Sequence, residues 1–310
     1  MVRPRRGAHR RVRRLPARGR VRARARPRGQ GDAQDRDPVR AVHDARRVVD
    51  RRRAGPGPPV QRVSSQRPAK VVRSLAEARA VVPPGSASYA AALAALPERG
   101  HVLDVGCGSG GASLPLAGRA ARITGVDPEE RLLAALAESC RALGVAVDTV
   151  TGRWPEAAAE VPAADVVVCH HVLYGAADAG PFARALADRA REGVVIEIPS
   201  VHPLAALDPL HERFHGVRRP PPRTAEAIVG QITAAGLDPE VTEWTDTLGH
   251  SSATTLDALA AGITKRLGLP EDRLPEVTEA LLDLGVDPAH PRFPGTVGRP
   301  LVTITLDGAA

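Results

Sequence analysis

Short apolar runs alternate with amphipathic stretches over residues 86–306, and this pattern predicts strands separated by helices. Residues 165–169 form a nearly continuous apolar run, as expected of a parallel strand buried on both faces. Residues 129–143 instead repeat leucine at helical spacing and stop at a glycine. The predicted strands are residues 101–105, 122–126, 145–150, 165–169, 193–198, 241–245 and 301–306. The predicted helices are residues 86–96, 129–143, 181–189, 225–235, 255–267 and 275–284, with a further helix beginning over 111–116.

This alternation predicts a doubly wound α/β fold, with a mostly parallel sheet covered by helices on both faces. In such sheets, ligands bind outside the carboxyl ends of the strands. Two longer stretches, residues 200–224 and 249–294, interrupt the alternation. Long connections of this kind are often lids or binding loops, so we expect lid-like insertions there, with padding of the sheet edge as the alternative.

A glycine-rich segment follows the first predicted strand and carries the most informative chemistry. It reads Asp104-Val-Gly106-Cys107-Gly108-Ser-Gly110. Glycine permits positive φ angles and lets the backbone approach a ligand closely. A helix beginning there would add unpaired N–H groups. The segment therefore predicts a site for a nucleotide-like ligand.

The acid at position 104 decides between two kinds of nucleotide-like ligand that the glycine pattern allows. Gly106, Gly108 and Gly111 also fit the dinucleotide-binding pattern, and Asp127 follows at the spacing of a ribose-binding acid. A carboxylate at Asp104 would repel a pyrophosphate, however, and would attract an ammonium group. A ligand with an ammonium group and no phosphate fits better.

Residues 102–110 resemble the first motif of the class I S-adenosylmethionine-dependent methyltransferases. The resemblance extends over about residues 89–306, and it implies a seven-stranded sheet whose last strand is antiparallel, with S-adenosyl-L-methionine as the cofactor. It further implies that an acid at Asp127 accepts both ribose hydroxyls, although a helix cap before Pro128 would use the same residue. The predicted cofactor-binding residues are Asp104, Gly106, Cys107, Gly108, Gly110, Asp127, Pro128, Arg153, Trp154 and Cys169.

The chain departs from the family pattern after the third strand. Arg153 stands where many relatives have an acid that binds the adenine amino group. Trp154 either stacks on the adenine or caps the core.

Two histidines follow the fourth predicted strand, in the sequence Cys169-His170-His171-Val172. The position resembles the family's fourth motif, where the chain passes the cofactor's sulfonium and the substrate. Histidine titrates near neutrality and can deprotonate an incoming hydroxyl or amine, so His170 and His171 are the candidate catalytic residues. We expect one of them to face the substrate. The Asn-Pro-Pro-Tyr type of motif that marks methylation of amino groups on nucleic-acid bases is absent.

The formal net charge of +8 combines two different regions. Residues 1–73 hold 24 of the 43 Lys and Arg residues and 5 of the 35 acids, which leaves the rest of the chain acidic. This first segment has no aromatic residue, and its composition predicts disorder. An inert tail, an arginine-rich arm for RNA and a miscalled translation start are three explanations for it.

The remaining composition favours a cytoplasmic protein with no membrane span. Three scattered cysteines are typical of a reducing compartment, no Cys/His spacing matches a zinc site, and arginines interrupt every apolar run near the N-terminus. We therefore expect a domain over residues 74–310 that transfers a methyl group to O, N or C of a small molecule, without a metal. An RNA methyltransferase, an NAD-dependent oxidoreductase and a non-catalytic cofactor-binding protein are the alternatives, and the oligomeric state stays open.

Overall fold

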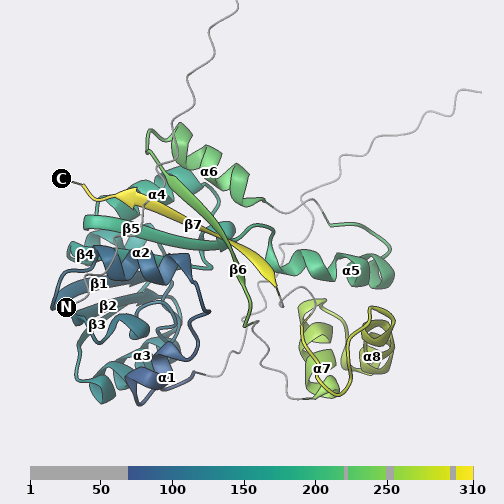
Figure 1. Cartoon of the computed structure of the whole chain (residues 1–310). Helices are drawn as coiled ribbons and strands as arrows, with labels where there is room; N and C mark the ends of the chain where they lie inside the picture. The colour runs from purple at the N-terminus through teal and green to yellow at the C-terminus, as the bar shows by residue number, and fades with distance from the viewer. Residues whose placement is uncertain (1–68, 220–222, 249–254, 294–297, 310) are drawn as a thin grey trace, which may run out of the picture. The chain divides into compact units, whose positions relative to one another are not determined.

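The computed structural model describes residues 69–219, 223–248, 255–293 and 298–309. Within them, one sheet has the strand order β3-β2-β1-β4-β5-β7-β6, and only β7 runs antiparallel to its neighbours (Figure 1). The sheet confirms the predicted fold class and the antiparallel last strand. Its strands are β1 (Gly100–Val105), β2 (Ala120–Asp127), β3 (Ala146–Thr151), β4 (Ala164–His170), β5 (Ala190–Pro199), β6 (Glu240–Asp246) and β7 (Arg299–Asp307).

Helices cover both faces of the sheet, as the alternation predicts. Successive side chains of a strand point to opposite faces, so Val102 packs with α2 and α3 while Leu103 packs with α4 and α6. The helices are α1 (Leu75–Arg79), α2 (Ala87–Ala95), α3 (Glu130–Leu143), α4 (Ala179–Ala187), α5 (Asp208–His215), α6 (Ala225–Ala234), α7 (Leu256–Arg266) and α8 (Leu274–Asp283).

The helix predicted to begin over residues 111–116 is wrong. The chain makes only a short 3₁₀ turn there, Leu114–Leu116. Gly110 adopts φ +96°, and Pro115 has no N–H to donate to an α-helical ladder. The glycine segment consequently lies at the end of β1 without a long helix pointing toward it.

Helices α5, α7 and α8 share a hydrophobic cluster of their own. Leu210 of α5, Ile263 of α7 and Val277 of α8 are almost fully buried in it. The predicted helices over 255–267 and 275–284 are confirmed, and α5 is an additional helix within the interruption at 200–224. Residues 249–254 lie outside the described part of the chain.

The packed chain begins slightly before the expected boundary at residue 73. Val72 is buried, and its N–H donates to Ser139 Oγ of α3 at 2.9 Å. The predictions of disorder, an RNA-binding arm or a miscalled start concern residues 1–73. Residues 1–68 of that segment lie outside the described residues. Among the helices that are described, none has the length and apolar character required to cross a membrane.

Candidate functional site

The glycine turn at the carboxyl end of β1 adopts left-handed backbone angles. Gly106, Gly108 and Gly110 have φ values of +70°, +52° and +96°. A Cβ on Gly106 would overlap the side chain of Val172, whereas a Cβ on Gly108 would meet no heavy atom within 4 Å. Gly106 is therefore required for packing against the segment after β4, and Gly108 borders open space that a ligand can approach.

Asp127 joins the end of β2 to this turn. Its Oδ2 accepts a hydrogen bond from the Gly108 N–H at 2.9 Å, and its Oδ1 accepts one from the Glu129 N–H at 2.9 Å. The two roles expected of Asp127 are compatible, because the oxygens of a carboxylate offer about four acceptor positions and the described residues use two of them. Pro128, the next residue, is exposed.

Asp104 lies one residue before the end of β1 and is almost fully buried. Ser113 Oγ donates to its Oδ2 at 2.6 Å. Burial raises the pKa of Asp104 to about 7, and the carboxylate of Asp127 adds to the effect. The donors that Asp104 meets in the described chain are thus the hydroxyl and the backbone N–H of Ser113.

The two cysteines predicted at the cofactor site are buried thiols. Cys107 lies in the glycine turn and Cys169 near the end of β4. Burial raises the pKa of both thiols, with a further contribution from the Asp104 carboxylate. They act as packing groups and not as thiolates.

The end of β3 reaches the same edge of the sheet, since the Gly152 N–H donates to the Asp127 carbonyl at 3.2 Å. Arg153 is exposed. Trp154 is buried in the hydrophobic cluster that includes α4, and its indole N–H donates to the Phe182 carbonyl at 3.3 Å. This contact favours the core-capping alternative for Trp154.

His170 and His171 lie after the apolar part of β4 and are both partly buried. Burial lowers the pKa of His170 to about 4, so its ring is neutral at physiological pH. His171 adopts φ +61°, and its N–H donates to the Glu197 carbonyl at 2.7 Å. Within the described part of the chain, His170 Nε2 and His171 Nδ1 are buried and have no hydrogen-bond partner.

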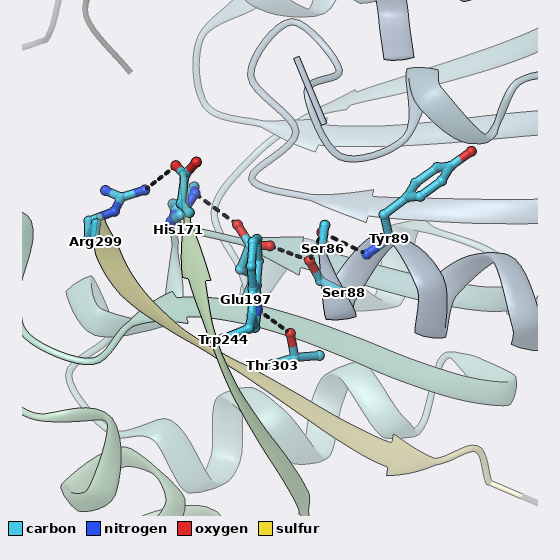
Figure 2. Close-up of polar contacts among 9 residues, drawn as sticks. Ser86, Ser88, Tyr89, His171, Glu197, Trp244, Arg299 and Thr303 are labelled. Atoms are coloured by element: carbon cyan, nitrogen blue, oxygen red, sulfur yellow. Dashed lines mark hydrogen bonds and ion pairs between the residues drawn. The ribbon is translucent and has the colours of Figure 1, made fainter. Parts of the chain in front are cut away.

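Glu197 of β5 connects His171 to α2 (Figure 2). Its Oε1 lies 3.1 Å from His171 Nε2, and its Oε2 accepts a hydrogen bond from Ser88 Oγ. Burial would raise the pKa of Glu197, but the hydrogen bond from His171, the nearby His170 and the bond from Ser88 outweigh it and hold the pKa at about 2.

Sequence reasoning missed Glu197 and Ser88. One signal for Glu197 was available, because it is the only charged residue in the apolar run 193–199. Ser88 is 109 residues away along the chain, and nothing local to its helix indicates the pairing.

The structure brings most of the predicted residues to one edge of the sheet. The glycine turn, Asp127 and Gly152 are joined by hydrogen bonds, and Val172 places the segment after β4 against Gly106. Open space over Gly108 and the remaining acceptor positions of Asp127 fit a hydroxyl-bearing nucleoside ligand.

Comparisons with known proteins match the part of the chain that contains the glycine turn. A model of the methyltransferase domain family matches residues 102–193. The ubiquinone biosynthesis O-methyltransferase of Rhizobium leguminosarum is 33% identical over 102 residues, which are 33% of this chain. The chain spans 40% of the length of that relative.

Solved structures with a related arrangement include the YcgJ protein of Bacillus subtilis, at 17% identity and a TM-score of 0.48, over 72% of this chain and 99% of that one. Magnesium protoporphyrin IX methyltransferase from Synechocystis PCC 6803, with bound SAH, gives 17% identity and a TM-score of 0.43, over 71% of this chain and 79% of that one.

The sheet order, the glycine turn and the acid at the end of β2 together are typical of an α/β domain that binds a nucleoside. Residues 102–193 match the methyltransferase domain family, and the sheet they help to form is the one expected of the class I S-adenosylmethionine-dependent methyltransferases, whose cofactor is S-adenosylmethionine.

Proposed function

We propose that this protein is an enzyme that transfers a methyl group from S-adenosylmethionine to O, N or C of a small molecule. The observation that carries the proposal is the hydrogen bond between the Gly108 N–H and the Asp127 carboxylate. This bond keeps a carboxylate that can accept hydrogen bonds from ribose hydroxyls beside a glycine turn that is open to a ligand. The named activity of the Rhizobium relative, O-methylation, supports the same class of reaction.

Each group of residues has a separate part in this proposal. Asp127 binds the two ribose hydroxyls through its free acceptor positions, and the turn from Gly106 to Gly110 lets the backbone approach the ligand. S-adenosylmethionine supplies an already activated methyl group. The protein's own contribution is therefore to align the methyl acceptor and to exclude water. For an acceptor that is still protonated, His170 or His171 also takes up its proton.

A calorimetric titration of the full chain with S-adenosylhomocysteine, with NAD in a parallel cell, tests the proposal. We expect micromolar binding of the first and none of the second. Asp127→Ala should weaken S-adenosylhomocysteine binding by at least about tenfold, because it removes charge-assisted hydrogen bonds worth about 1.5–3 kcal/mol each.

Asp148→Ala is the matched control for that variant. Asp148 is a half-exposed carboxylate on β3 that pairs with Arg122, away from the glycine turn, so its loss should leave the affinity unchanged. Binding of NAD instead, or equal affinity in both variants and the wild type, would contradict the proposed function.

A further inference from the structure

Glu197 is a buried carboxylate in the apolar centre of the sheet, where its loss of hydration must be offset by hydrogen bonds. Removing a carboxylate from water costs several kcal/mol unless donors surround it. Here two donors do so, His171 from the segment after β4 and Ser88 from α2 (Figure 2). A second serine, Ser86, lies 3.1 Å from Ser88 Oγ and completes a polar row from the helix N-terminus to the histidine.

The same glutamate holds both the backbone and the ring of His171. The Glu197 carbonyl accepts the His171 N–H at 2.7 Å, while its Oε1 faces the ring Nε2 at 3.1 Å. A left-handed φ of +61° is uncommon for a histidine and persists where neighbouring contacts impose it. His171 is thus fixed in position and in rotation.

This contact also decides which ring nitrogen carries the proton. An ionised carboxylate only accepts hydrogen bonds, so Nε2 of His171 must be the donor, and in the neutral ring Nδ1 then keeps its lone pair. That Nδ1 is buried and has no partner in the described chain, although the ring as a whole is 33% exposed. A buried acceptor without a donor is a position for a donor supplied by a ligand.

We propose that Glu197, backed by Ser88, is the positioning residue that presents His171 Nδ1 as the proton acceptor for a hydroxyl of the methyl acceptor. The inference rests on the proposed function and extends it to a substrate class, molecules whose reacting hydroxyl is still protonated at neutral pH. The next residue, Val172, packs against Gly106, which brings His171 beside the glycine turn. His170 has no such carboxylate on its ring, and its low pKa disfavours the protonated form.

The proton and electron pairs balance in this arrangement. His171 Nδ1 takes the hydroxyl proton as the O–H bond breaks, and the oxygen lone pair forms the bond to the methyl carbon. The pair from the broken carbon–sulfur bond stays on sulfur, and His171 then releases its proton to water. Glu197 stays ionised throughout and stabilises the imidazolium that forms.

The tautomer of His171 tests the proposal without a known acceptor. The full chain is labelled with ¹⁵N-histidine, and long-range ¹H–¹⁵N spectra are recorded at about pH 9, where imidazoles are neutral. The His171 signals are those that disappear in His171→Gln. We expect a single tautomer with the proton on Nε2. In Glu197→Met, which keeps the volume and removes the acceptor, both tautomers should appear.

Glu192→Met, an exposed position on the same strand, is the matched control and should retain the single tautomer. Ser88→Ala provides a second variant if Glu197→Met fails to fold, and it should also weaken the preference. A proton on Nδ1 in the wild type, a mixture of tautomers there, or an unchanged tautomer in the folded variants would overturn the proposal.

A parallel titration with S-adenosylhomocysteine separates this inference from the proposed function. Glu197→Met should bind it within about twofold of the wild type, because the glycine turn and Asp127 are untouched. Absent binding in the wild type would contradict the methyltransferase proposal alone, whereas normal binding with the wrong tautomer would contradict the role of Glu197 alone.

Discussion

Gly106 and Gly108 lie in the same turn, but a side chain is excluded at each for a different reason. Alanine substitutions should distinguish the two reasons. Gly106→Ala places a methyl group against Val172 and strains a φ of +70°, so we expect a stability loss of roughly 2–4 kcal/mol. Gly108→Ala adds only backbone strain, about 1–2 kcal/mol, because its Cβ meets open space. The added methyl group instead lies where the ligand is expected to bind. Gly108→Ala should therefore lose more free energy of S-adenosylhomocysteine binding than free energy of unfolding. Urea unfolding and calorimetry measure the two effects, and the same pattern in both variants would refute the distinction.

Asp104 should make stability depend on pH in the direction opposite to most carboxylates. Its folded pKa of about 7 lies above the unfolded value of 3.8, so between these values the folded state holds a proton that the unfolded state has lost. Stability therefore falls as pH rises through this window, by roughly 2–4 kcal/mol. Asp104→Asn keeps an acceptor for Ser113 and cannot titrate. Urea unfolding at pH 5 and pH 8 should show the wild type losing stability relative to Asp104→Asn, and parallel profiles would show that Asp104 is already ionised at low pH.

At the scale of elements, the helices α5, α7 and α8 should respond to mutation separately from the sheet. Ile263 of α7 is fully buried in their cluster, and Ile263→Ala should cost about 2–5 kcal/mol there. Hydrogen exchange should quicken in these three helices and stay slow in β1, β4 and β5. The matched variant Ile228→Ala, in α6 on the sheet, should do the reverse. Uniform loss of protection in both variants would mean that the two clusters unfold as one unit.

Periodicity predicted the elements well where burial repeats along the chain, and it failed where a contact is distant. Buried strands such as β4 are continuous apolar runs, and α3 repeats leucine at helical spacing. The local sequence was therefore sufficient to predict these elements. The helix after the glycine turn was overpredicted, because Gly110 and Pro115 outweigh the apolar spacing. Asp127 was predicted from its place after a strand, its spacing from the glycines and the family resemblance, and its ligand-binding role stays a prediction. The link from His171 through Glu197 to Ser88 spans three elements, and only the folded sheet brings them together.

For the whole molecule, residues 69–73 test where the packed chain begins. Two truncated proteins, lacking residues 1–68 and residues 1–73, differ by the burial of Val72 and its bond to Ser139 Oγ at 2.9 Å. They also differ by the largely exposed ion pairs of Lys70 with Glu77 and of Arg73 with Glu138, which contribute little. The shorter protein should be less stable in urea by roughly 1.5–3 kcal/mol, since it exposes the surface that Val72 covers. Ser139→Ala should then cost more in the longer protein than in the shorter one, because only the longer one retains the Val72 N–H that needs an acceptor. Equal stability of the two proteins, or an equal effect of Ser139→Ala in both, would mean that folding does not depend on this segment. The expected domain boundary at residue 73 would then hold.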